Sequence, residues 1–96
     1  MSPAKIKKLN NLRKKLDHLD NSFIKLIRKR TNLINDVLKL KDKKNQIIDK
    51  SRIKKILYRI KKKSIKNNID PKITNKIWKN MIWAYIDYER RNFKKK

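Results

Sequence analysis

Apolar residues recur at intervals of three and four over most of the first half of the chain. This spacing places them on one face of an α-helix, so we predict a single amphipathic helix from about residue 8 to residue 41. At 1.5 Å per residue the helix would be roughly 50 Å long, too long for two shorter helices of the same chain to cover. A second copy of the chain is therefore expected to cover part of its apolar stripe, which consists of Leu9, Leu12, Leu16, Leu19, Phe23, Leu26, Ile34 and Val37 or Leu38.

The helical pattern breaks and then resumes in a second segment. Residues 42–46 are polar and predict a connecting loop. Apolar spacing returns over about residues 50–67, where Asp49 or Ser51 can cap the N-terminus of a second helix.

A third helix is predicted from a strong start signal. Asp70 is an N-capping residue, and Pro71 follows at the first helical position, where its missing N–H is harmless. The apolar spacing then continues over about residues 71–92. Because the chain has no glycine and only two prolines, it lacks the turn residues that hairpins need. We therefore predict an all-α fold, a three-helix chain with one long N-terminal helix.

Length and composition restrict the possible chemistry. The 96 residues are enough for one domain, predicted at residues 8–92 between basic tails at 1–7 and 93–96. Without cysteine and with His18 as the only histidine, the chain lacks a thiolate metal site and a Ser-His-Asp triad. We expect no metal and no cofactor. No stretch has the length of a signal peptide or a membrane span, so we expect a reducing cytoplasm and no membrane partner.

The formal net charge of +23 suggests a nucleic-acid partner, because lysine and arginine neutralise phosphates. Another cause fits the composition as well. Lysine, asparagine and isoleucine dominate while glycine, alanine and proline are scarce, as AT-rich codons would produce. The chain contains no recognisable nucleic-acid-reading module and no clustered aromatic platform. A small basic helical nucleic-acid binder is therefore the alternative of another class, and it is not favoured.

Arginine is scarce, and four cations have an informative spacing. Arg30 and Lys41 are eleven residues apart, so on a helix they lie within roughly 20° of each other and can bind one ligand together. Arg13 lies roughly 25 Å further along that helix and cannot reach the same ligand. Arg52 opens the second helix. This arrangement suggests a pocket for a small polyanion that a second chain completes, whereas the simpler interpretation is a set of solvated surface charges.

The third helix carries a stripe of Trp78, Ile82, Tyr85 and Glu89 at spacings of four, three and four. Glu89 is the only glutamate in the chain. At the end of an apolar stripe it would be partly desolvated, but residue statistics favour a surface position beside Arg90.

The segment from Leu12 to Asp20, followed by Arg30 and Lys41, resembles the first helix of the all-helical chorismate mutases. Arg52 and the run from Ile77 to Glu89 extend the likeness over most of the chain. The resemblance implies an intertwined homodimer that converts chorismate to prephenate in aromatic amino-acid biosynthesis, without metal or cofactor.

The resemblance also implies roles for individual side chains. Arg13 would come from the partner's long helix, Arg30 and Arg52 would hold the substrate carboxylates, and Lys41 would hydrogen-bond the ether oxygen. Glu89 would face the same oxygen, and only a protonated carboxyl can donate a hydrogen bond to it. The pocket residues implied in this way are Arg13, Arg30, Lys41, Asp49, Arg52, Tyr85 and Glu89.

Two positions depart from the usual mutase pattern. Family mutases commonly have a glutamate after the second-helix arginine, and here that residue is Ile53. In this respect the chain is similar to the isochorismate pyruvate lyases, which share the fold and the cationic pocket. Asp49 still supplies an acid that could meet the substrate hydroxyl. Glu89 stands where many relatives have glutamine. The resemblance favours the mutase, with the lyase as the alternative.

Overall fold

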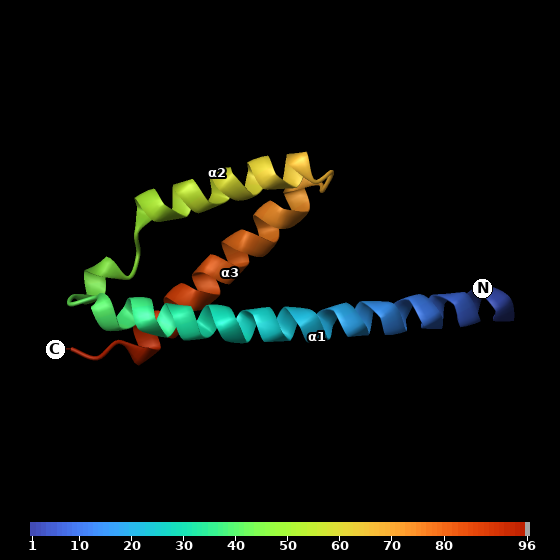
Figure 1. The fold of residues 1–96 in the computed structure, drawn as a ribbon, viewed down its shortest axis with the longest axis horizontal. Helices are drawn as coiled ribbons and strands as arrows, with labels where there is room; N and C mark the ends of the chain where they lie inside the picture. The colour runs from blue at the N-terminus through green and yellow to red at the C-terminus, as the bar shows by residue number, and fades with distance from the viewer. Residues whose placement is uncertain (96) are drawn as a thin grey trace. The chain divides into compact units, whose positions relative to one another are not determined.

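A computed structural model describes residues 1–95, and within them the chain is helical without strands (Figure 1). The elements are α1 (Pro3–Leu40), the short 3₁₀ helix η1 (Lys44–Gln46), α2 (Lys50–Lys66) and α3 (Pro71–Asn92). The predicted all-α fold and its three long helices are confirmed. No helix among the described residues is long and apolar enough to cross a membrane.

The helix boundaries follow from local chemistry. Asp49 caps α2, and its Oδ1 accepts a hydrogen bond of 3.0 Å from the backbone N–H of Arg52. Of the two candidate caps, it is therefore the aspartate that acts. Asp70 caps α3 in the predicted way, with Pro71 at its start. Between α2 and α3, Asn68 adopts a φ of 56°, a left-handed conformation that asparagine tolerates better than most residues.

The chain divides into two compact units, one from Met1 to Leu33 and one from Ile34 onward, and each is described by itself. The first unit is helical from Pro3, so the expectation that residues 1–7 form a tail outside the helix was wrong from that residue on. No residue between Met1 and Leu33 is buried. The predicted apolar stripe on this unit is exposed, with more than half of the side chain accessible at Leu12, Leu16, Leu19, Phe23 and Leu26.

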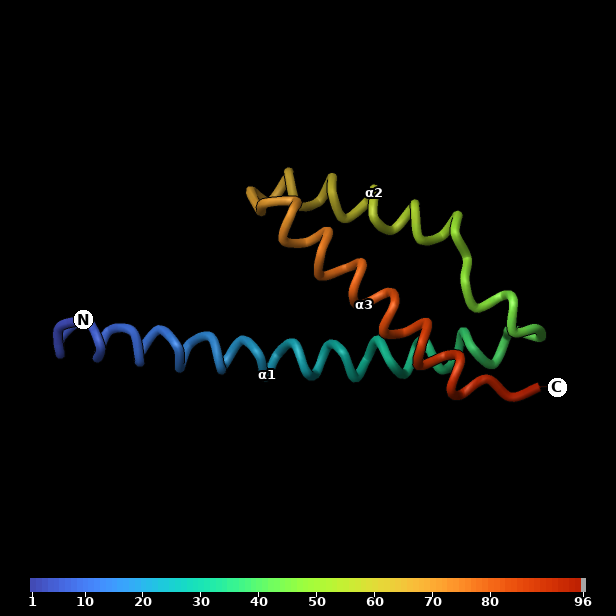
Figure 2. The backbone as a smooth tube through the Cα atoms, turned by 180° about the vertical axis from the view of Figure 1, so that it is seen from behind, coloured from blue at the N-terminus to red at the C-terminus, as the bar shows by residue number. Residues whose placement is uncertain are grey.

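The second unit has a core of its own, drawn from the end of α1, the loop, α2 and α3. Figure 2 shows the C-terminal part of α3 beside the last turns of α1. There the Tyr88 hydroxyl donates a 2.7 Å hydrogen bond to Oδ1 of Asn35. Phe93, which was expected in a tail, packs against this core, and Lys96 lies outside the described residues. The buried apolar residues are Leu38, Ile47, Ile56, Ile82 and Ile86.

Candidate active site

An ion pair joins the end of α1 to the end of α3. The Nζ atom of Lys41 lies 3.0 Å from Oε1 of Glu89. The Glu89 side chain is only 6% exposed and that of Lys41 is 19% exposed, so solvent screens this pair much less than a surface pair. Burying a carboxylate without a nearby cation would be energetically costly. Lys41 compensates the negative charge of the buried Glu89 side chain.

The burial of Glu89 corrects the expectation of a surface position beside Arg90. Glu89 lies on the same face of α3 as Ile82 and Ile86, both of which are buried in the core. The face that packs the helix against the core therefore also carries the carboxylate inward. Residue statistics could not show this, because burial depends on how α3 packs.

Lys41 lies just outside the helix that was predicted to contain it. α1 ends at Leu40, and the backbone N–H of Lys41 bonds at 3.1 Å to the carbonyl of Leu38, three residues earlier. The side chain then extends back over the loop, where Nζ also contacts the carbonyl oxygen of Ile47 at 3.5 Å. Ile47 is buried in the core, so it anchors the loop that carries this carbonyl. The ammonium is thus held by groups on two separate segments.

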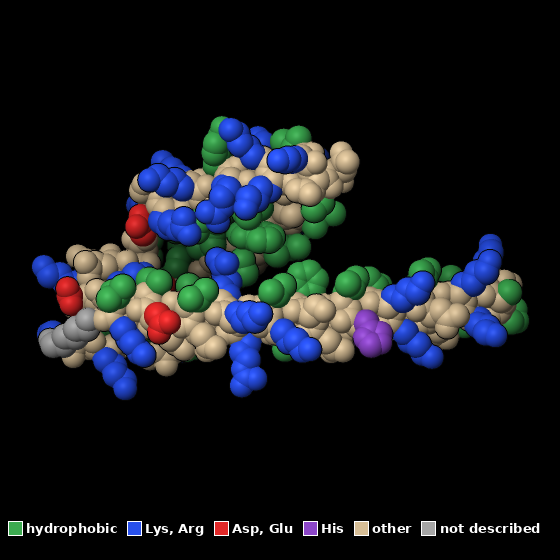
Figure 3. Space-filling view, viewed as in Figure 1, with side chains coloured by type: hydrophobic (Ala, Val, Ile, Leu, Met, Phe, Trp, Pro, Cys, Tyr) green, Lys and Arg blue, Asp and Glu red, His purple; other side chains and the backbone are tan. Residues whose placement is uncertain are grey.

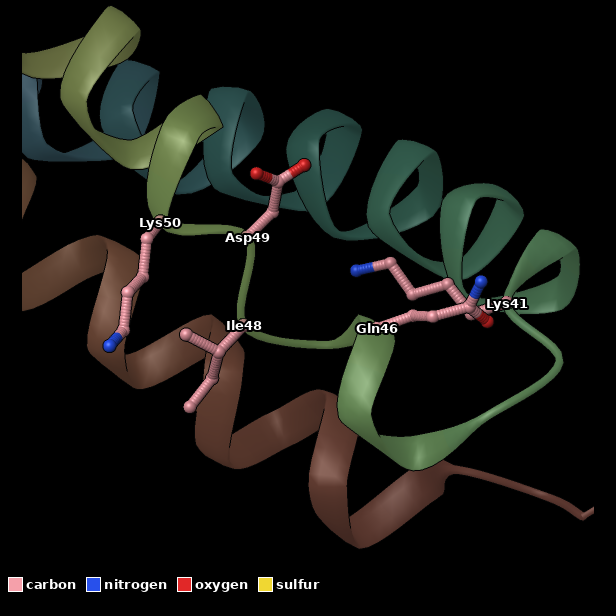
Figure 4. A pocket seen from close by; sticks show the side chains of 5 residues that line it. All are labelled: Lys41, Gln46, Ile48, Asp49 and Lys50. Atoms are coloured by element: carbon pink, nitrogen blue, oxygen red, sulfur yellow. The ribbon is translucent and has the colours of Figure 1, made fainter.

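A hollow opens beside this ammonium, lined by Lys41, Gln46, Ile48, Asp49 and Lys50. Figure 4 shows the side chains of Lys41 and Asp49 on one side of the loop backbone, while Ile48 and Lys50 point to the other side. The charged side chains on the same side of the loop are therefore one cation, Lys41, and one acid, Asp49.

The first turn of α2 supplies positive charge next to Asp49, which lines the hollow. Arg52 lies in that turn, is exposed, and forms no ion pair with any residue among 1–95. The first turn of α2 contains no acidic residue, and the N-terminus of a helix carries a partial positive charge. Asp49 uses one carboxylate oxygen for the helix cap. Its other oxygen remains an acceptor at the edge of the hollow.

Tyr85 lies one turn before Glu89 on α3 and is half-buried. Its ring meets the ring of Tyr88 edge to face, with centroids 6.4 Å apart and planes at 82°. This contact fixes the ring of Tyr85 on the face of α3 that also carries Glu89.

The remaining predicted cations lie in the first unit. Arg13 is exposed and Arg30 is half-buried. Both belong to the unit from Met1 to Leu33, so their part in a shared pocket stays a prediction.

The loop groups around Lys41 were not predicted from the sequence. These are the Gln46 side chain, the Ile47 carbonyl and the two lining residues Ile48 and Lys50. A weak signal did exist, because Gln46 follows Lys43 at the spacing of a helix capping box, in which a glutamine side chain bonds back to the N-cap backbone. Without serine or threonine at the first position the signal is easily overlooked.

Comparison with known proteins gives two matches. The family model described as "Chorismate mutase type II" matches residues 12–90. The chain is also 40% identical over 78 residues to a protein named chorismate mutase from Methanocaldococcus jannaschii, and the alignment covers 80% of this chain and 79% of that protein. No solved structure matches the chain.

Proposed function

The chain belongs to the chorismate mutase type II family, and we propose that it rearranges chorismate to prephenate for aromatic amino-acid biosynthesis by holding the dianion among fixed cations. The reaction is an isomerisation in which a C–O bond breaks while a C–C bond forms in the same molecule. It needs no nucleophile and no redox partner. What the protein must supply is a folded substrate and compensation of the negative charge that develops on the ether oxygen.

The observation that carries the proposal is the position of Lys41. Its ammonium lies at the wall of an open hollow, and its two protein contacts hold it there before any ligand arrives. Because the ammonium is already in place, it costs little reorganisation when charge develops on the ether oxygen. We assign Lys41 the donor role toward that oxygen.

Arg52 and Asp49 suit the two ends of the substrate. A guanidinium binds a carboxylate through two parallel hydrogen bonds. The backbone N–H groups in the first turn of α2 carry partial positive charge and would also attract a carboxylate. Arg52 is therefore assigned to one substrate carboxylate, and Asp49, as an acceptor, to the substrate hydroxyl. Tyr85 would contribute its ring as a wall on the α3 side.

Glu89 has two different tasks in this proposal. In the structure its carboxyl group pairs with Lys41 at 3.0 Å. In the complex it would share Lys41 with the ether oxygen, and a protonated carboxyl would donate a second hydrogen bond to that oxygen. An ionised carboxylate at the same place would repel the developing charge.

The exposed stripe of the first unit supports a homodimer with shared sites. The five stripe residues from Leu12 to Leu26 are each more than half exposed, and such an apolar surface is costly for a monomer in water. We propose that a second copy covers this stripe. Arg13 would then reach the partner's pocket, and Arg30 would join Lys41 and Arg52 in its own.

The activity is tested by incubating the purified protein first with chorismate and then with isochorismate, and by identifying the products. Prephenate from chorismate is the expected result. Salicylate and pyruvate from isochorismate would favour the lyase, whose case rests on Ile53 in the place of the usual glutamate. Turnover of neither substrate would refute both enzymatic proposals.

The shared site is tested by mixing two inactive variants. Arg13→Ala and Lys41→Ala chains are unfolded and refolded together, and the heterodimer is isolated by two different affinity tags. One of its two pockets then has neither substitution, so activity should return to roughly half of the wild-type value per dimer. A verified heterodimer that stays inactive would rule out donation of Arg13 by the partner.

A further inference from the structure

Residues 42–46, which begin two positions after the end of α1, form a loop whose shape depends on one side chain. The backbone N–H groups of Asp42 and Lys43 both donate to Oε1 of Gln46, each at 2.8 Å. One side-chain oxygen therefore accepts hydrogen bonds from two successive backbone donors just past the end of α1. The loop has no apolar residue between Asp42 and Gln46 that could pack against the core. These hydrogen bonds therefore hold the conformation of the loop.

This loop is anchored at both ends. On one side the N–H of Lys41 bonds to the carbonyl of Leu38, and on the other Ile47 is buried in the core. The bonds to Gln46 shape the segment between these two anchors. Backbone bonds from Gln46 to the carbonyl of Lys43, at 3.0 Å, and from Ile47 to that of Lys44, at 3.2 Å, complete a short η1 turn.

The shape of this segment determines where the Lys41 ammonium lies. Lys41 is the first residue past the helix, so the helix holds its backbone from one side only. Its Nζ contacts the carbonyl of Ile47, at the other end of the same loop, and Glu89 on α3. If the loop opened, the distance from the Lys41 backbone to that carbonyl would change, and the ammonium would lose one of its two supports.

We infer that Gln46 is a positioning residue for the proposed reaction, because its amide oxygen holds the loop that places the Lys41 ammonium beside the hollow. The inference rests on the proposed function and adds to it a residue that acts through Lys41. Only the oxygen of Gln46 is used, since both bonds are accepted by Oε1. Two successive N–H groups that converge on one oxygen also form a small anion-binding concavity, so a carboxylate would serve equally well.

The test compares two substitutions of the same residue. Gln46→Met keeps the length of the side chain and removes the acceptor, whereas Gln46→Glu keeps the acceptor. For Gln46→Met we expect kcat to fall about tenfold, because a small misplacement of a catalytic group has a large effect on rate, while KM changes by less than about twofold. For Gln46→Glu we expect kcat within about twofold of the wild type. Asn45→Asp adds the same negative charge at an exposed neighbour and controls for its effect on binding of the dianion.

Two further measurements separate positioning from a general loss of structure. Amide hydrogen exchange at Asp42 and Lys43 should accelerate in Gln46→Met and remain slow in Gln46→Glu. In a Lys41→Met background, Gln46→Met should lower kcat no further, because Gln46 acts through an ammonium that is no longer there. If Gln46→Met does not fold, Gln46→Ser, which is too short to reach both N–H groups, replaces it in every comparison.

The outcomes distinguish this inference from the proposed function. A wild-type protein that does not turn over chorismate refutes the proposed function and, with it, this role for Gln46. An active wild type with an unchanged kcat in Gln46→Met refutes the positioning role alone. An equal loss in Gln46→Met and Gln46→Glu, or an additive loss in the Lys41→Met background, refutes it as well.

Discussion

The two units of this chain carry equally regular apolar patterns, but only one of them buries its pattern. From Ile34 onward, apolar residues of three helices and a loop form a core, and the Lys41–Glu89 pair lies at its edge. Between Met1 and Leu33 the stripe is just as periodic, and no residue is buried. Periodicity is enough to specify a helix, whereas burial requires a packing partner. Charges differ in the same way, because the second unit contains a buried glutamate that pairs with a lysine, whereas no residue from 1 to 33 is buried.

The largest effect is expected where the first unit depends on a second copy. Leu19→Asp places a charge in the exposed stripe, so we expect the dimer to dissociate and activity to fall close to the uncatalysed rate, since each pocket would lose its partner arginine. Asn21→Asp adds the same residue on the opposite side of the helix and should keep both properties. Sedimentation and the chorismate assay measure the two effects. A Leu19→Asp protein that remains dimeric and active would mean that the stripe does not form the interface.

The ion pair of the second unit gives the next largest effect. Lys41→Met should lower kcat by about 10²–10³-fold, the usual cost of removing a donor to developing charge. It should also lower the free energy of unfolding by about 3 kcal/mol, because Glu89 is left buried without its cation.

A second substitution separates these two effects of Lys41. The double variant Lys41→Met with Glu89→Gln should regain most of the stability and none of the activity, since the buried charge is gone but the donor is not restored. Denaturant unfolding and steady-state kinetics measure both properties. A single variant as stable as the wild type would show that the pair contributes nothing to the fold.

A moderate effect is expected at the first turn of α2. Arg52→Lys keeps the charge and removes the two-pronged hydrogen bonding, so we expect a loss of about 2–3 kcal/mol in transition-state binding, measured as kcat/KM. Arg59→Lys, the same change at an exposed position further along α2, should have no effect. Lys61, Lys62 and Lys63 should likewise tolerate replacement. Figure 3 shows how densely lysine and arginine cover α2, which makes these matched controls necessary. Equal losses at Arg52 and Arg59 would place the pocket elsewhere.

The smallest effect at neutral pH is expected for Glu89→Gln. The glutamine amide can donate to the ether oxygen through its N–H and can still accept from Lys41 through its oxygen, so the variant keeps both contacts of the site. We expect kcat within about threefold of the wild type. Steady-state kinetics with chorismate provide the measurement. A loss as large as that of Lys41→Met would mean that the carboxylate itself is needed at this position.

The helices and their limits follow from the sequence because helix formation is a local process. The spacing of apolar residues, the cap at Asp49 and the Asp70-Pro71 start lie within a few residues of what they control. The start of α1 was missed by five residues because Pro3 is tolerated in a first turn and the lysine-rich segment after it is compatible with a helix.

The contacts around Lys41 could not be predicted in the same way. Lys41 and Glu89 are 48 residues apart, and they meet because α3 packs its buried face against the end of α1. The sequence alone determined the all-α class, the limits of α2 and α3 and the set of cations. The tertiary structure decided that Glu89 is buried and that its carboxylate meets Lys41. The physical reason is that helices form from interactions within a few residues, whereas an ion pair between residues 48 positions apart depends on how separate helices pack.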